Sequence, residues 1–425
     1  MTAAALVVFA CSAACPRPDE APPVRAAEPL LLGTGVAQPD QPLSIRLQGE
    51  PAGIYSADPG PGLQTPLARR IHSRFPQLRI DPCLQRAAAA YLQADPDLYA
   101  VLPLTFAEFV LHWAGCPDAT ATVSRLYTSE DGDGVLLDHL EKLIPHEEYT
   151  HLGVARAAAA SPYRSLWLVM LAARRYSMQP LPTAGDPGAV LPLLFRVDEE
   201  FERVAVAITE TGGRVDFVEV GQSDGWVVAT VPLEERVGSQ WIELLGYGAR
   251  GPQVLALFPV SVGRPPPDSW VGHPRRDESW ITDIEQAEDY AAELLAQDRS
   301  RFGLVTLDRD PRLDAVARAH SMEMAAFGYF GHVSPNTGSV VDRLVSIDYD
   351  VGFAAENIAM GASLAEAQEG LMRSPGHRAT VLSPDATHFG MGVARDDRDD
   401  VGNVYILTQV FASPSPEPVL IEGAL

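Results

Sequence analysis

Three short stretches near the C-terminus decide how the chain is interpreted: GHVSPNTGSVVDRL (residues 331–344), AAENIAMG (354–361) and MRSPGHRATVL (372–382). They place His332, Glu356 and His377 among alanine, valine, leucine and methionine, beside turns marked by glycine and proline. Ionisable side chains in such apolar surroundings are normally paired or functional. These three residues are therefore the candidate site, although no spacing of the HExxH kind fixes their geometry.

The segment around this site, residues 281–412, combines helical and extended patterns. Apolar residues recur at helical spacing over residues 284–302 and 313–327, and Ser363 with Glu366 fits a capping box that opens another helix. The stretches FGMGVAR and NVYILTQVF predict an antiparallel strand pair. Helices around a small antiparallel sheet give an α+β sandwich.

Six motifs in this segment carry a family resemblance. They are ARAHSMEMA (317–325), FGHVSP (330–335), AENIAMG (355–361), SPGHRATVL (374–382), THFGMGVA (387–394) and TQVF (408–411). In this order they resemble the CAP superfamily of cysteine-rich secretory, antigen 5 and pathogenesis-related proteins (the SCP domain), in its short bacterial form. The resemblance implies an α-β-α sandwich with a central cavity lined by two histidines and two acids.

The resemblance assigns the site residue by residue. His332 and His377 match the two histidines, and Glu356 matches the first acid. The second acid is missing: Leu371 stands where a tryptophan is expected and Ser374 stands near the acidic position. Glu369 is a poor substitute, because displacement by one turn points its side chain elsewhere.

Several functions are consistent with this set. Two imidazoles and a carboxylate suit a divalent ion such as zinc, and an open fourth position would allow hydrolysis. The resemblance implies binding more strongly, since CAP proteins are associated with apolar ligands, sterols and envelope partners. We favour a non-enzymatic module that binds a metal or a small or apolar ligand at the cell envelope. A metal-dependent hydrolase of peptides or wall material and a structural surface protein stay open as alternatives. A purely structural role of His332, Glu356 and His377, as a hydrogen-bonded cluster that fixes three loops, also stays open.

Other polar residues are weaker candidates. Ser334 lies near His332, but HVSP offers no nucleophile elbow, so a backbone-bonding role is expected. His320 is expected in the core, His151 and His388 at turns, and Asn357 as a backbone anchor. The acidic loop 395–400 lacks the DxDxDG calcium pattern and is expected to be a solvated hairpin tip.

An earlier region, residues 66–180, repeats part of this pattern. Asp81 and Pro82 lead a helix as Asp310 and Pro311 do, and THLGVAR (150–156) resembles THFGMGVAR (387–395). We interpret the region as a degenerate CAP-like α+β domain, because it lacks the three site stretches. Its Cys83 and Cys116 are expected to form one disulfide in an oxidising compartment.

Residues 191–262 read as six short strands separated by glycine-containing turns, which predicts an immunoglobulin-like β-sandwich. The proline-rich stretch 263–280 is expected to be a semi-rigid linker.

The N-terminus and the net charge bear on location. Residues 1–15 resemble a short secretory or lipoprotein-type signal, with Cys11 or Cys15 as the site of a lipid anchor, and residues 16–65 resemble a Pro/Gly-rich tether. Anchoring and plain secretion both stay open, and we expect no transmembrane span. A formal net charge of −24 argues against a nucleic-acid partner.

Overall fold

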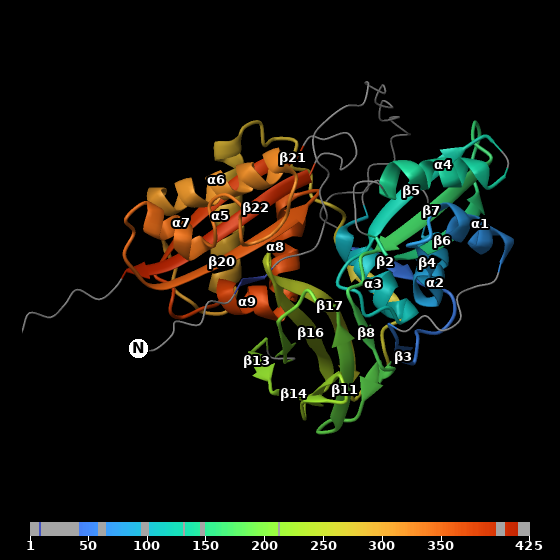
Figure 1. Cartoon of the computed structure of the whole chain (residues 1–425), viewed down its shortest axis with the longest axis horizontal. Coiled ribbons are helices and arrows are strands. Elements are labelled where there is room, and N and C mark those ends of the chain that lie inside the picture. The colour runs from blue at the N-terminus through green and yellow to red at the C-terminus, as the bar shows by residue number, and fades with distance from the viewer. Residues whose placement is uncertain are drawn as a thin grey trace, which may run out of the picture.

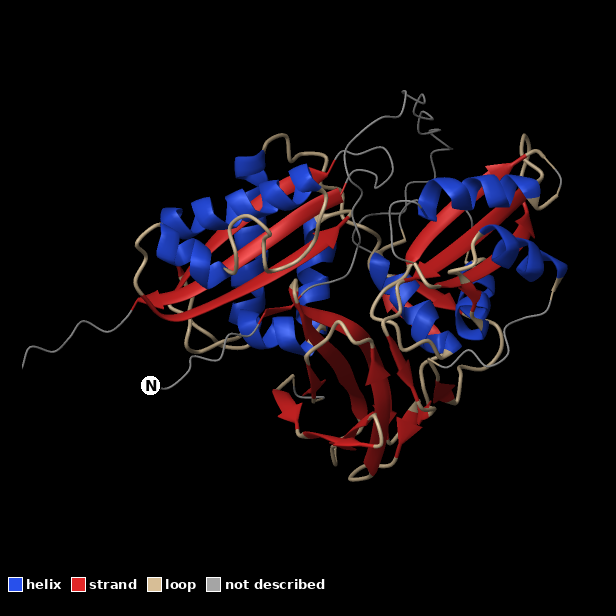
Figure 2. Ribbon diagram, viewed as in Figure 1, coloured by secondary structure: helices blue, strands red, loops and turns tan. Residues whose placement is uncertain are grey.

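The computed structural model describes residues 8–9, 42–57, 65–94, 102–130, 132–144, 149–210, 213–396 and 404–414. Its described parts form three bodies: an α/β body near the N-terminus, an all-β body and a C-terminal α/β body (Figure 1). Figure 2 shows helices on both faces of the sheets in the two α/β bodies and almost none on the all-β body. The chain is therefore of mixed α/β class.

The N-terminal body has one mixed sheet, in which β4 lies parallel to β6 and the other pairs are antiparallel, with helices on both faces. Its elements are α1 (Pro66–Arg74), β4 (Arg79–Ile80), α2 (Pro82–Tyr91), α3 (Leu104–Ala114), β5 (Thr122–Thr128), α4 (Gly134–Leu143), β6 (His151–Ala158) and β7 (Ser165–Ala172). The sheet order is β4-β6-β7-β5. Asp81 begins α2 because its carboxylate accepts from the backbone N–H groups of Cys83 and Leu84, and Pro82 fills the first turn.

The all-β body consists of two sheets packed face to face. Its strands are β8 (Tyr176–Met178), β10 (Ala184–Gly185), β11 (Val190–Val197), β12 (Arg203–Thr209), β13 (Val215–Val218), β14 (Val220–Ser223), β15 (Trp226–Pro232), β16 (Gly238–Gly248) and β17 (Gly251–Val262). The sheet orders are β10-β17-β16-β12-β13 and β14-β15-β11-β8. Phe195 from one sheet and Phe258 from the other are both fully buried in one apolar cluster, which joins the sheets. The body begins at β8, earlier than the sequence predicts, because β8 pairs with β11.

The C-terminal body carries the candidate site. Its elements are α5 (Ile284–Arg301), β19 (Asp308–Arg309), α6 (Pro311–Phe327), α7 (Val340–Ser346), β20 (Val351–Gly361), α8 (Leu364–Arg373), α9 (Pro375–Val381), β21 (His388–Asp396) and β22 (Val404–Pro414). The sheet order is β1-β20-β22-β21-β19, where β1 (Val8–Phe9) lies parallel to β20.

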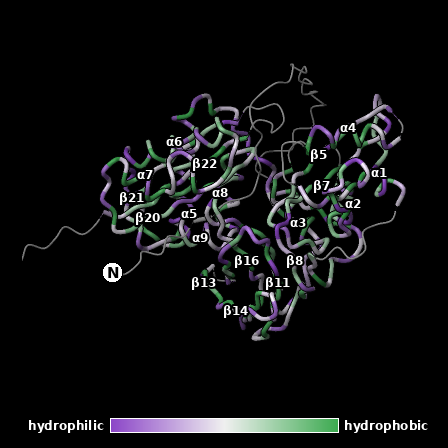
Figure 3. The backbone as a smooth tube through the Cα atoms, in the orientation of Figure 1, coloured by the Kyte–Doolittle hydropathy of each residue, from purple (hydrophilic) through white to green (hydrophobic). Residues whose placement is uncertain are grey.

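The two faces of this C-terminal sheet bury different helices. Met391 and Leu407 pack in one apolar cluster with residues of α5 and α8, whereas Val410 packs in another with residues of α6 and α7. Figure 3 shows these strands as mainly hydrophobic along their length. Helix α6 lies very close to β21, since a Cβ atom at Gly390 would stand 2.1 Å from the backbone carbon of Leu313.

Part of the predicted tether and linker is structured. Strand β2 (Leu43–Arg46) pairs with β18 (Ser269–Gly272), and β3 (Ile54–Tyr55) pairs with β9 (Leu181–Pro182). Residues predicted as a loose tether and a Pro-rich spacer are thus joined by backbone hydrogen bonds. The rest of residues 1–41, including Cys11 and Cys15, lies outside the described residues apart from β1.

Candidate functional site

The centre of the candidate site is the buried Glu356 carboxylate on β20. His332 Nδ1 lies 2.9 Å from Glu356 Oε1, and an Arg343 Nη2 donor pairs with Glu356 Oε2. Glu356 is fully buried, and His332 and Arg343 are nearly so. Both carboxylate oxygens are therefore engaged by side chains of the protein itself.

Arg343 also holds the loop that carries His332. Its Nη1 donates to the carbonyl oxygens of Gly338 at 2.7 Å and His332 at 3.3 Å. Arg343 comes from α7, which begins at Ser339 with a capping box to Asp342. The guanidinium therefore ties the His332 loop to strand β20 through Glu356.

The charges around Glu356 set its ionisation. Burial alone would raise the pKa of the carboxyl, but the charge of Arg343, the neighbouring His320 and the hydrogen bond from His332 outweigh it and bring the pKa to about 2. The carboxylate is ionised at neutral pH. It can then only accept hydrogen bonds, so His332 Nδ1 carries the proton of this bond.

His320 completes the cluster from α6. Its Nε2 lies 3.0 Å from the carbonyl oxygen of Gly331 and 3.8 Å from Glu356 Oε1. Burial lowers the pKa of His320 to about 4, and Glu356 only partly offsets this. His320 is a neutral core histidine that supports the His332 loop.

His377 belongs to a second hydrogen-bonded chain. His377 Nδ1 lies 2.7 Å from Ser374 Oγ, and Ser374 donates to the carboxylate of Glu243 on β16. Glu243 also accepts from the backbone N–H of Gly376 at 2.9 Å, at the first turn of α9. Burial raises the pKa of Glu243 to about 7, although these two hydrogen bonds oppose the rise. A glutamate of the all-β body thus positions a histidine of the C-terminal body.

The hydrogen bonds around His332 and those around His377 reach strand β20 at two neighbouring residues, Glu356 and Asn357. Glu356 is paired in register with Val410, which packs against α6 and α7. The next residue, Asn357, bonds the His377 carbonyl oxygen at 3.2 Å and Gln409, which in turn bonds Gln368 on α8. Because neighbouring strand residues point to opposite faces, the bonded partners of Glu356 and of Asn357 lie on different faces of the sheet.

This arrangement bears on the metal hypothesis. Among the described residues, the ligand atoms of His332, Glu356 and His377 do not form a group within 4.8 Å of one another. The one group that does so is Asp81 with Cys83 and Cys116, and its sulfurs are joined to each other. The structure brings His332 to Glu356 but does not gather all three predicted ligands around one point.

The β16–β17 turn covers the His332 loop. The backbone N–H groups of His332 and Val333 both donate to the carbonyl oxygen of Arg250, at 3.1 and 3.2 Å. Gly251 follows with a φ of 89°, and a Cβ atom there would lie 3.1 Å from the Cβ of His332. Only glycine fits this turn without strain. The all-β body is therefore part of the wall of the site.

The weaker candidates have local roles. Ser334 Oγ donates to Glu323 at 2.7 Å and accepts from the backbone N–H groups of Asn336 and Thr337, which fixes a turn. The Nδ1 atoms of His151 and His388 each lie 2.8 Å from the hydroxyl of the preceding threonine. Residues 397–400 of the acidic loop lie outside the described residues.

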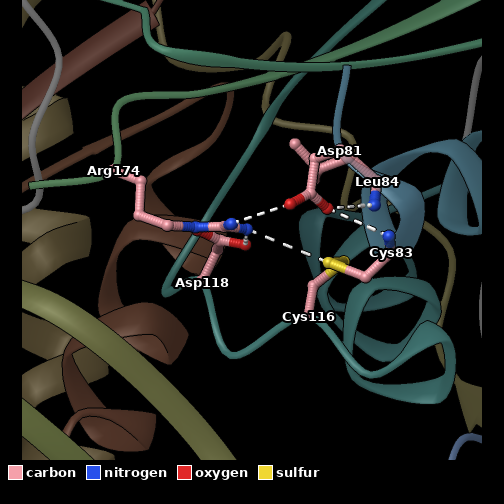
Figure 4. The surroundings of a disulfide bond; sticks show 6 residues. All are labelled: Asp81, Cys83, Leu84, Cys116, Asp118 and Arg174. Carbon is pink, nitrogen blue, oxygen red and sulfur yellow. Dashed lines mark hydrogen bonds and ion pairs between the residues drawn. A yellow bond between two sulfur atoms is a disulfide. The ribbon is translucent and has the colours of Figure 1, made fainter. Parts of the chain in front are cut away.

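Cys83 and Cys116 form a disulfide that links α2 to the end of α3 (Figure 4). Beside it the buried Arg174 lies between Asp81 and Asp118, at 2.8 and 2.6 Å (Figure 4). Burial lowers the pKa of Arg174, but the two carboxylates outweigh this and hold it well above its usual range. The guanidinium is charged, so this polar cluster stabilises the fold.

Sequence reasoning missed Arg343 and Glu243. Arg343 stands inside the quoted stretch 331–344 as a basic residue on an otherwise apolar helix face, which is a usable signal. Glu243 stands in the apolar strand WIELLGYG, where an acid at a buried position also signals a partner. What the sequence did not indicate was that this partner would come from another body.

Comparisons with known proteins agree for the C-terminal body. Residues 292–411 match the family model "CAP: Cysteine-rich secretory protein family". The chain is 38% identical over 120 residues to the uncharacterized membrane protein YlbC and 37% identical over 110 residues to the uncharacterized protein YkwD, both of Bacillus subtilis. These matches cover 28% and 26% of this chain and span 35% and 43% of the relatives' own lengths.

Among solved structures, the chain is similar to an extracellular protein containing a SCP domain from Bacillus anthracis, at 18% identity and a TM-score of 0.28. That similarity covers 57% of this chain and 86% of the other. Within the described residues, no helix combines the length and apolarity that a membrane crossing requires.

Proposed function

We propose, because residues 292–411 belong to the cysteine-rich secretory protein (CAP) family, that this chain is an exported binding protein without enzymatic activity. Its C-terminal body would hold a small or apolar ligand or an envelope component beside His332 and His377. The observation that carries the proposal is the pairing of both Glu356 oxygens with His332 and Arg343.

A hydrolase would need something different at this carboxylate. A general base must reach the substrate or its water, and its pKa should lie near the working pH. Glu356 has a pKa of about 2 and both of its oxygens are engaged. These properties suit a fixed counter-charge that holds a ligand-facing histidine in one orientation.

The test is turnover of a broad panel of peptide, ester and cell-wall substrates by the wild type and by Glu356→Gln. We expect both proteins to stay at the background rate. Circular dichroism of each variant checks that it is folded, and Glu369→Gln on the exposed side of α8 is the matched control. Wild-type turnover that Glu356→Gln abolishes in a folded protein, while Glu369→Gln keeps it, would overturn the proposal.

A metal ion is the second candidate cargo, and the ring orientations favour it. In His332 and His377 the Nδ1 atom makes the protein hydrogen bond, to Glu356 and Ser374. A carboxylate behind the imidazole is a common support for metal-binding histidines. Glu356 would then support His332 from behind instead of acting as a ligand itself.

Metal analysis tests this second candidate. The wild type, His332→Ala and His377→Ala would each be equilibrated with zinc and dialysed. A bound ion predicts near-stoichiometric zinc in the wild type and a loss in both variants. Equal, negligible zinc in all three proteins excludes the metal and leaves an organic ligand.

The N-terminal body supports the proposal as a degenerate CAP-like domain. In both α/β bodies a two-residue strand lies parallel to a long strand, at Arg79–His151 and at Asp308–His388. The following strand pairs place His151 opposite Ala172 and His388 opposite Ala412. Counted from these matched pairs, Glu356 opposite Val410 corresponds to Val123 opposite Met170.

That correspondence gives the N-terminal body a different role. It has Val123 at the position that corresponds to Glu356, so it would be a scaffold without a site. The all-β body, which we propose to be an immunoglobulin-like sandwich, would join the two copies and close the wall of the site with its Arg250–Gly251 turn.

Export, with lipid anchoring at Cys11 or Cys15 or with free secretion, completes the proposal. Cleavage before either cysteine would remove β1 from the edge of the C-terminal sheet. Intact mass of protein from the native host tests both. Removal of the first residues together with a mass increase of a diacylglyceryl group supports anchoring. Removal without added mass supports free secretion, and an unprocessed chain contradicts export.

A further inference from the structure

The three bodies meet around a cavity of about 270 Å³ that is separate from the CAP site. It lies where α3, β16 to β18 and the end of α8 converge (Figure 1). Ligand sites are often found at domain interfaces, and this volume is slightly below the roughly 300–1,000 Å³ of sites for drug-sized molecules. The cavity suits a molecule about the size of one or two small rings.

Aromatic and proline side chains form most of its wall. Three tryptophans from three different elements line it, together with Tyr55 and Phe109: Trp113 on α3, Trp241 on β16 and Trp270 on β18. Tryptophan offers a large apolar face and one N–H donor. Among the described residues, the buried Nε1 of Trp113 has no hydrogen-bond partner. A buried donor of this kind is costly unless a ligand or water supplies an acceptor.

One charged pair also lines the cavity. Arg373 Nε lies 2.7 Å from Glu108 Oε2, and Arg373 Nη2 donates to Glu108 Oε1 at 3.0 Å. This bidentate pair uses only part of the donor capacity of the guanidinium. The remaining nitrogen, Nη1, carries two N–H donors and lies 3.4 Å from the exposed carboxylate of Glu369. It can still donate to an oxygen atom of a guest.

The charge in the cavity favours a neutral guest. The negative charge of Glu108 is matched by Arg373. Burial lowers the pKa of His112 to about 4, so its ring is neutral at pH 7. A cation would find no unmatched carboxylate among these lining residues, and an anion would approach a chain of net charge −24.

Polar hydroxyls complete the chemistry. Thr105 and Ser239 line the cavity and are only half-buried. A guest must therefore present apolar faces to the tryptophans and several hydroxyl or amide groups to the donors and acceptors between them. A pyranose ring combines a C–H face with a rim of hydroxyls in this way.

We propose that this junction cavity is a carbohydrate subsite that binds one neutral pyranose ring between the tryptophans and the Glu108–Arg373 pair. The ring could belong to a free monosaccharide or to a sugar of a polymer, and the chemistry of recognition is the same. The subsite is independent of the ligand proposed for the CAP site.

The experiment uses the full chain and saturation-transfer NMR with glucose, N-acetylglucosamine and a short N-acetylglucosamine oligomer. We expect saturation of ring C–H protons and weakening of binding by about tenfold or more in Trp241→Ala, which is about 1.4 kcal/mol, because tryptophan anchors are among the side chains whose truncation costs most. Thr105→Val removes a lining hydroxyl with little change of shape and should also weaken binding. Trp226→Ala, a half-buried tryptophan outside the lining, is the matched control and should bind as the wild type does.

Each arm has a defined meaning. Tighter binding of the oligomer assigns the subsite to a polymer, and equal binding assigns it to a single ring. The inference is overturned if none of these sugars binds at millimolar concentration. It is also overturned if Trp241→Ala and Thr105→Val both bind with the affinity of the wild type. His332→Ala should leave sugar binding unchanged, so failure of the CAP-site proposal is distinguishable from failure of this one.

Discussion

At the residue scale, the buried pair of Glu356 and Arg343 has a direct energetic consequence. Glu356→Gln leaves the Arg343 guanidinium buried without its counter-charge. Breaking a buried ion pair in this way costs about 3–5 kcal/mol. We therefore expect urea denaturation to show a loss of that order in the free energy of unfolding of the C-terminal body.

The matched control is Glu369→Gln, whose side chain is largely exposed and pairs with Arg373 at 3.4 Å. Exposed pairs contribute about 0–1 kcal/mol, so this variant should unfold close to the wild type. Equal stability of the two variants would contradict the pairing of Glu356 described above.

The raised pKa of Glu243 predicts that the stability of the protein falls as pH rises. An ordinary ion-paired acid has the opposite effect. Its pKa is raised from 4.5 to about 7, so the folded state holds a proton that the unfolded state has already released between these values. Stability therefore falls as pH rises from about 4.5 to 7, by about 3 kcal/mol from this residue. Thermal or urea unfolding between pH 5 and 8 measures it.

The control for this prediction is Glu243→Gln. The amide keeps an acceptor for the Gly376 N–H and does not titrate. The free energy of unfolding of this variant should therefore lack the decrease with pH that is assigned to Glu243 in the wild type. An identical pH profile in both proteins would show that Glu243 titrates near its ordinary pKa.

Only part of this residue-scale detail could be predicted. His332 and Glu356 stand out because they are ionisable groups in apolar stretches, and the structure places them in contact. The pairing of His377 with Ser374 and Glu243 depends on a strand more than 130 residues away. No local pattern encodes that contact, because it is made by packing between two bodies.

At the element scale, the glycines of β21 control how closely α6 approaches the sheet. A Cβ atom at Gly390 would stand 2.1 Å from the Leu313 carbon, and the matching Gly153 of β6 stands equally close to Leu84. Overpacking of this kind typically costs about 1–3 kcal/mol. We expect Gly390→Ala and Gly153→Ala each to destabilise the protein by at least that much in urea unfolding.

Gly370 in α8 is the matched control, since nothing lies within 4 Å of a Cβ built there. Gly370→Ala should be neutral or stabilising by up to about 1 kcal/mol, because alanine favours helix. Destabilisation by Gly370→Ala equal to that by Gly390→Ala would refute the close-approach explanation.

The elements themselves were largely predictable where capping and periodicity were strong. Asp81 and Asp310 begin helices in the structure, and the apolar runs after THLG and THFG form long strands. Helix α5 begins at Asp283, whose carboxylate accepts from the backbone N–H of Gln286. Strands β2 and β18 were not predicted as a pair, since their pairing joins segments over 200 residues apart.

At the scale of the whole molecule, the disulfide restricts the unfolded chain more than it changes the folded one. It closes a loop with a sequence separation of 33. A loop of this size corresponds to about 3–4 kcal/mol in the chain-entropy model. The double variant Cys83→Ser/Cys116→Ser should lose stability of that order by urea unfolding under oxidising conditions.

Reduction of the wild type with dithiothreitol should reproduce the loss, whereas the double variant should not respond to the reductant. A reductant-insensitive wild type with two free thiols by alkylation and mass spectrometry would contradict the disulfide.

Contacts between the bodies were beyond the reach of sequence reasoning. Glu108 with Arg373, Glu243 with Ser374, and Arg250 with the His332 loop each join two bodies. The site is therefore a property of the whole chain, because its wall and one of its histidine supports come from outside the CAP domain.

The most direct test of the account is the titration of Glu356 by carbon NMR of a protein with labelled glutamate carboxyls, assigned with Glu356→Gln. A carboxylate held as the internal partner of Arg343 and His332 should stay ionised as pH falls, with a pKa of about 2. A pKa near 6 or 7 would contradict the account, because it is the value expected of a working general acid or base.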